Sequence, residues 1–104
     1  MNRLNEYINS GDGVMLYFFS NSCQACLSLR PKIREMAEAE FPAMEYIEID
    51  AQASPEVTAE ASVFTAPVII IYFEGREYIR ESRYISVGQL QEKIRRYYEM
   101  VFGT

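Results

Sequence analysis

The stretch Ser22-Cys23-Gln24-Ala25-Cys26 follows an apolar run at residues 14–19 and opens a segment with the periodicity of a helix. Its two cysteines are the only ones in the chain and stand three positions apart. One helical turn brings such positions onto one face, so the two sulfurs can close a disulfide. Free N–H groups and the helix dipole stabilise a thiolate at a helix start. We therefore predict that Cys23 is the nucleophile of thiol–disulfide exchange and that Cys26 is the resolving thiol.

Three other interpretations of the cysteine pair compete with this prediction. A zinc site usually takes four protein ligands, or three and a water, and the chain has two cysteines and no histidine. A metal would therefore have to be shared between two chains. A purely structural disulfide gains little from closing so short a loop. The third alternative is a pair of inert core cysteines, because free cysteine packs as a small hydrophobe.

The composition predicts the class of protein and excludes several partners. With 104 residues, 49% of them hydrophobic, residues 1–104 should form a single domain with a real core. A net charge of −5 argues against nucleic acid, whose phosphates would be repelled. The longest apolar run, residues 66–73, is too short to span a membrane. The first residues lack the pattern of a signal peptide, so we expect a cytoplasmic location, where such a motif is more often catalytic or metal-binding.

The first half of the chain predicts helix, strand, helix and strand in that order. A short helical pattern ends at Gly11-Asp12-Gly13, and the apolar residues 14–19 resemble a strand buried on both faces. The helix after the cysteines contains Pro31 and should end before Pro42. Residues 45–50 alternate between apolar and polar types, as a strand does. The connection is long enough for a helical crossover, so the two strands should be parallel.

The second half predicts a helix, a hairpin and a final helix. Ser54-Pro55-Glu56 combines a capping serine, a proline at the first helical position and an acid in the first turn. The apolar strand at residues 66–73 meets a tight turn at Glu74-Gly75 and returns. Ser86 and Gln89 form a capping box before the last amphipathic helix. This order predicts an α/β fold with a central mixed sheet of about four strands, flanked by helices on both faces.

The chain resembles the thioredoxin family in several motifs at matching separations. The C-x-x-C follows the first predicted strand, as in thioredoxin-like proteins. Pro31 stands five positions after Cys26, where the family has a helix proline, and Pro67 occupies the place of the cis proline that faces the cysteines. The resemblance covers essentially the whole chain apart from a missing first strand, and it implies a thioredoxin-like fold.

This resemblance also implies a function and a substrate site. The protein would reduce disulfides of other proteins through a mixed disulfide, drawing electrons from a disulfide reductase or a small thiol. It would work as a monomer, with no metal, nucleotide or flavin cofactor. In the family, an extended substrate pairs with the backbone of the residue before the cis proline, which is Ala66 here. We assign Thr65, Ala66, Pro67 and Ser22 to substrate binding.

Departures from the family pattern leave some questions open. Ser22 replaces the usual tryptophan, and Gln24-Ala25 replaces Gly-Pro between the cysteines. Tyr17 and Tyr46 take the places of a buried aspartate and a facing lysine. A buried carboxylate can accept the proton of a resolving thiol, so the base for Cys26 is here water, a substrate group or an unplaced acid.

The sequence also leaves open the position of Phe64 and the class of function. Phe64 either joins an apolar collar that meets a protein substrate or packs inward. The alternative function is a low-turnover interaction module or redox sensor that holds an extended peptide beside Pro67. An oxidant or isomerase would require an exported precursor, which the start of the chain does not favour.

Overall fold

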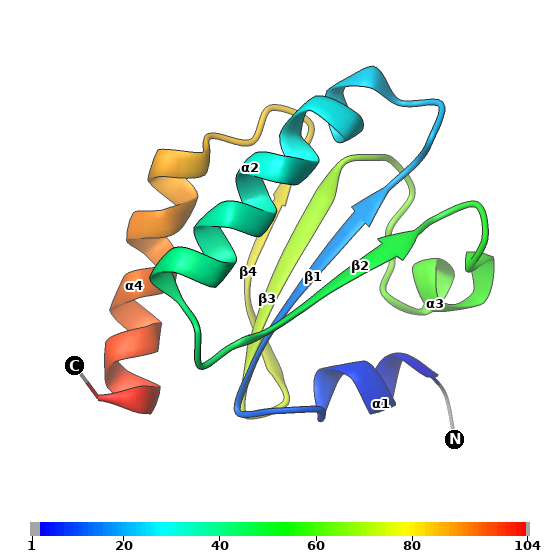
Figure 1. The fold of residues 1–104 in the computed structure, drawn as a ribbon. Coiled ribbons are helices and arrows are strands. Elements are labelled where there is room, and N and C mark those ends of the chain that lie inside the picture. The colour runs from blue at the N-terminus through cyan, green and yellow to red at the C-terminus, as the bar shows by residue number, and fades with distance from the viewer. Residues whose placement is uncertain (1–2, 104) are drawn as a thin grey trace.

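The computed structural model describes residues 3–103, which form a four-stranded mixed sheet in the order β2-β1-β3-β4 (Figure 1). The strands are β1 (Gly13–Phe19), β2 (Glu45–Asp50), β3 (Val68–Phe73) and β4 (Arg76–Ser82). The helices are α1 (Arg3–Ile8), α2 (Gln24–Glu40), α3 (Pro55–Glu60) and α4 (Val87–Phe102). β1 and β2 are parallel, whereas β3 runs antiparallel to both β1 and β4. The predicted α/β fold and its mixed sheet are confirmed.

The sheet separates two hydrophobic cores (Figure 1). Successive side chains of a strand point to opposite faces, so β1 supplies both cores. Met15, Tyr17 and Phe19 pack in the core beneath α2 and α4. Val14, Leu16 and Phe18 pack in the core beneath α1 and α3. Every residue of β1 is therefore buried, which explains why its sequence is apolar without alternation.

Three loops meet at the end of the sheet where α2 begins (Figure 1). One carries β1 into α2, one carries α3 into β3, and one carries β4 into α4. Pro31 lies inside α2, as predicted, and α2 ends before Pro42. The opposite end of the β3–β4 hairpin turns through Glu74 and Gly75, both at positive φ, which matches the predicted tight turn.

Two capping predictions need correction, and the structure also shows where Phe64 lies relative to α3. Ser54 precedes α3, but its hydroxyl makes no capping bond, because its ψ of 66° departs from the extended conformation that aims a capping side chain. Phe64 lies outside α3, which ends at Glu60. Ser86 does cap α4 by accepting from the Gln89 N–H, yet no reciprocal bond from the Gln89 side chain occurs among residues 3–103.

None of the helices within residues 3–103 combines the length and the apolar character needed to cross a membrane.

Candidate active site

Cys23 and Cys26 form a disulfide at the start of α2, with their Cα atoms 5.3 Å apart. Cys23 is the N-cap residue of α2, and its Sγ accepts a 3.1 Å hydrogen bond from the backbone N–H of Cys26. Cys23 is half-buried, whereas Cys26 is fully buried in the core beneath α2. Only the Cys23 sulfur is therefore open to another molecule, and it sits where a helix start favours negative charge.

The segment before β3 lies against Cys23. The Ala66–Pro67 peptide bond is cis, and the carbonyl oxygen of Ala66 is 3.9 Å from Cys23 Sγ. Pro67 is buried, and its carbonyl accepts a 3.1 Å hydrogen bond from the Arg83 N–H. The N–H of Ala66 has no hydrogen-bond partner among the described residues. A free backbone group beside the redox sulfur can pair with an extended chain.

The other two predicted binding residues occupy different places around Cys23. Thr65 is exposed, next to Ala66. Ser22 is exposed on the β1–α2 loop, and its hydroxyl is 2.9 Å from that of Ser20. The structure thus brings Ala66 onto the cysteine pair, with Thr65 and Pro67 as its chain neighbours, while Ser22 bonds within its own loop.

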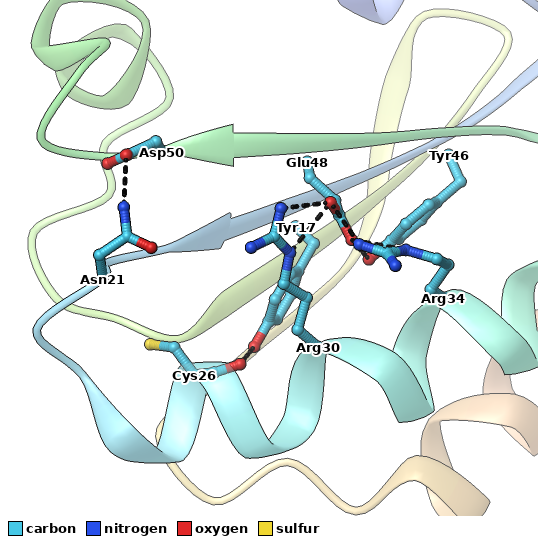
Figure 2. Close-up of polar contacts among 8 residues, drawn as sticks. All are labelled: Tyr17, Asn21, Cys26, Arg30, Arg34, Tyr46, Glu48 and Asp50. Atoms are coloured by element: carbon cyan, nitrogen blue, oxygen red, sulfur yellow. Dashed lines mark hydrogen bonds and ion pairs between the residues drawn. The ribbon is translucent and has the colours of Figure 1, made fainter.

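The hydroxyl of Tyr17 lies under Cys26, donating a 2.8 Å hydrogen bond to the Cys26 backbone carbonyl (Figure 2). Burial, reinforced by the nearby charge of Glu48, raises the pKa of Tyr17 to about 12. The phenol is thus a permanent donor at neutral pH. It occupies the position where the family resemblance implies an aspartate, and it does not supply a base for the Cys26 thiol.

Glu48 holds a cluster of donors between β2 and α2 (Figure 2). Its carboxylate accepts hydrogen bonds from Arg30, Arg34 and the Tyr46 hydroxyl, at 2.9–3.2 Å. Burial alone would raise the pKa of the Glu48 carboxyl, but these bonds outweigh it and the pKa is lowered. The Glu48 carboxylate therefore stays ionised at neutral pH. Its role is to hold α2 against β2 rather than to exchange protons.

Asp50, the other carboxylate drawn in Figure 2, also accepts hydrogen bonds through both of its oxygens. One of its oxygens accepts from the Asn21 side chain at 3.1 Å. The other accepts from the backbone N–H groups of Gln52 and Ala53. Neither Glu48 nor Asp50 hydrogen bonds to a cysteine sulfur in the described part of the chain. Water and substrate groups thus stay on the predicted list of bases for Cys26.

Arg30, Arg34 and Glu48 were not predicted from the sequence as residues of this site. Arg30 and Arg34 stand one helical turn apart, and Tyr46 and Glu48 alternate along β2, so each pair shares a face. That spacing was the available signal for the cluster.

Phe64 is 86% exposed, which excludes inward packing. No group of three or more Cys, His, Asp or Glu within residues 3–103 is arranged to hold a metal ion.

Comparisons with known proteins agree on one family. A family model described as thioredoxin matches residues 2–96. The thioredoxin-like protein YdfQ of Bacillus subtilis (strain 168) is 29% identical over 100 residues, covering 96% of this chain and 88% of YdfQ. Thioredoxin H8 of Arabidopsis thaliana is 28% identical over 100 residues, covering 96% of this chain and 66% of that protein.

Solved structures give the same result. A mutant thioredoxin from Halobacterium salinarum NRC-1 superposes with a TM-score of 0.83 at 19% identity. The match covers 95% of this chain and 86% of the Halobacterium chain. Thioredoxin 1 from Thermosipho africanus TCF52B superposes with a TM-score of 0.77 at 31% identity, covering 84% and 96%. The first similarity concerns the fold alone, and the second extends to sequence.

Proposed function

The chain belongs to the thioredoxin family, and from this premise we propose that it is a thiol–disulfide oxidoreductase that reduces disulfides in other proteins. The observation that carries the proposal is the asymmetry of the cysteine pair. Cys23 is accessible at the N-cap of α2 and accepts a backbone N–H, whereas Cys26 is fully buried. An attacking sulfur needs access and a stabilised thiolate, while a resolving sulfur needs only to reach the first.

The reaction starts from the reduced pair. The Cys23 thiolate attacks one sulfur of a partner disulfide, a bond forms between the two proteins, and the partner's second sulfur leaves as a thiolate. The Cys26 thiolate then attacks Cys23 Sγ and releases the partner's first sulfur. The partner gains two electrons and two thiols, and the Cys23–Cys26 disulfide remains. A disulfide reductase or a small thiol returns the two electrons.

Protein substrates are favoured by the surface around Cys23. The free N–H of Ala66 and its carbonyl, 3.9 Å from the sulfur, offer an extended chain two backbone partners. Thr65, the chain neighbour of Ala66, and Ser22, the chain neighbour of Cys23, are both exposed. Phe64, at 86% exposure, adds an apolar side chain next to Thr65. A small disulfide would leave all of these groups unused.

The proton of the Cys26 thiol goes to water or to the departing substrate thiolate. The Tyr17 hydroxyl already donates a hydrogen bond to the Cys26 carbonyl, and the Glu48 carboxylate already accepts hydrogen bonds from two arginines and Tyr46. Since a buried carboxylate base accelerates proton transfer, we expect Cys26 to release the mixed disulfide more slowly than in family members that carry such a base.

We further propose that the chain acts as a single-domain monomer in the reducing cytoplasm.

The test is the reduction potential of the Cys23/Cys26 pair. The protein is equilibrated in graded thiol–disulfide buffers, trapped with an alkylating reagent and weighed. We expect a reversible two-electron transition at about −270 mV, a potential typical of thioredoxin-type reductants. A value above about −180 mV would reassign the protein to the oxidants. If no reversible disulfide forms, the low-turnover binding module becomes the better account, and a Cys23→Ser protein should then bind partners as wild type does.

A further inference from the structure

Arg80 joins the edge strand β4 to the end of α3. Its Nη2 donates to the carbonyl of Ala61 at 2.8 Å, and its Nη1 lies 3.4 Å from the carbonyl of Ser62. Its other donors meet the Glu77 carboxylate through two bonds of 2.9 Å. Arg80 pairs in register with Ile70, so its side chain shares the face of the sheet on which α3 packs.

The carbonyls that Arg80 binds belong to a helix terminus. Ser62 has a φ of 58°, the Ser62 N–H bonds to Ala59, and the Val63 N–H bonds to Thr58. This pattern is the Schellman motif that ends a helix, and it leaves the last carbonyls pointing outward without intrahelical partners. The Arg80 guanidinium satisfies the C-cap carbonyl of Ala61, reaches that of Ser62 just beyond the cap, and complements the negative end of the helix.

This terminus begins the segment that reaches the redox pair. Residues 63–67 rise from α3 to the end of the sheet where α2 begins (Figure 1). Val63 is buried in the core, and Pro67 is held by the Arg83 N–H at the far end. Between them, Phe64 and Thr65 are exposed, and Ala66 presents its free N–H beside Cys23. The position of the segment is thus determined by its two ends, and Arg80 holds the first.

We propose that Arg80, oriented by Glu77, is a positioning residue for substrate docking: it fixes residues 63–67 so that the Ala66 backbone meets an extended protein chain at Cys23. This inference rests on the proposed function and deepens it. Within residues 3–103, the Arg80 side chain hydrogen bonds to Glu77, Ala61 and Ser62 and to neither the cysteines nor the Ala66 backbone, so it acts through the loop. Its removal should weaken docking and leave the chemistry of the sulfurs intact.

The experiment uses the reduced protein in single turnover. Loss of the protein's own Cys23 and Cys26 thiols, measured by alkylation and mass, is followed against increasing insulin, a protein disulfide, and against hydroxyethyl disulfide, which has no chain to dock. For Arg80→Gln we expect the half-saturating insulin concentration to rise about tenfold, as for loss of one charged hydrogen bond. The maximal rate with insulin, the rate with hydroxyethyl disulfide and the reduction potential should stay at wild-type values. Glu77→Gln should raise the insulin concentration by a smaller factor.

Arg76→Gln is the matched control, because Arg76 is an exposed arginine of the same strand whose side chain makes no hydrogen bond or ion pair among the described residues. It should behave as wild type with both substrates. An unchanged insulin response in Arg80→Gln, or an equal loss with both disulfides, overturns the proposal. If Arg80→Gln does not fold, Glu77→Gln decides by the same criteria. Failure of the proposed function is distinct, since wild-type protein would then react with neither disulfide.

Discussion

The Tyr17 hydroxyl donates a 2.8 Å hydrogen bond to the backbone carbonyl of Cys26, joining the buried centre of β1 to the first turn of α2. That carbonyl belongs to the residue that we propose as the resolving cysteine, so the bond holds the backbone of Cys26 in place. A phenol with a pKa of about 12, raised mainly by burial, keeps this proton throughout the neutral range. The position therefore serves to anchor Cys26 rather than to exchange protons with it.

Replacing Tyr17 with phenylalanine should test this anchoring role. Tyr17→Phe keeps the ring in the core and removes only the donor, so we expect a loss of about 1 kcal/mol in the free energy of unfolding. Denaturant unfolding measures it. Tyr72→Phe is the control, because Tyr72 is a buried tyrosine of β3 whose hydroxyl makes no hydrogen bond among residues 3–103, and the substitution should cost less. Equal costs in the two variants would contradict the anchor.

Substituting Glu48 should change the acid stability of the protein. The folded-state pKa of Glu48 lies below its ordinary value of 4.5, because bonds from Arg30, Arg34 and Tyr46 outweigh the effect of burial. Its stabilisation is therefore present above that value and lost as pH falls through the folded pKa. Glu48→Gln should cost about 1–2 kcal/mol at neutral pH, and less as the pH drops.

Denaturant unfolding from neutral pH down to about pH 2 measures this difference. Glu38→Gln is a suitable control, because Glu38 is exposed on α2 and its side chain makes no hydrogen bond or ion pair in the described chain. A gap between wild type and Glu48→Gln that widens toward acid pH would refute the assignment.

The two cysteines should give different products when each is replaced. Cys26→Ser keeps the accessible sulfur and removes the resolving one, so a mixed disulfide with a substrate protein should accumulate. Cys23→Ser leaves only the buried sulfur, and no mixed disulfide should form. Non-reducing electrophoresis after incubation with oxidised substrate shows both results. Trapping by Cys23→Ser instead would reverse the assigned roles.

Phe64 should affect docking and leave stability unchanged. The side chain is 86% exposed, so Phe64→Ser should alter the free energy of unfolding by no more than about 0.5 kcal/mol. We expect slower reaction with insulin and an unchanged rate with hydroxyethyl disulfide. Met100→Ser, at a similarly exposed apolar position of α4, is the control and should react as wild type. Wild-type insulin kinetics in Phe64→Ser would exclude a docking role.

The sequence by itself determined the order of elements, the sheet and the redox motif. The unbroken apolar run of β1 required burial on both faces, and the crossover length required β1 and β2 to be parallel. The three-residue spacing of the cysteines at a helix start predicted that they could form a disulfide, since one turn of α2 sets their separation. These features follow from periodicity and local chain geometry, both of which can be predicted from the sequence alone.

Only the tertiary structure decided which side chains meet across elements. The bond from Tyr17 to Cys26, the donors gathered by Glu48 and the hold of Arg80 on Ala61 join residues distant in the sequence. Each depends on strand register, on which face a residue occupies and on where a long side chain can reach. Phe64 shows the same limit, since its exposure follows from where α3 ends and not from its own apolar character.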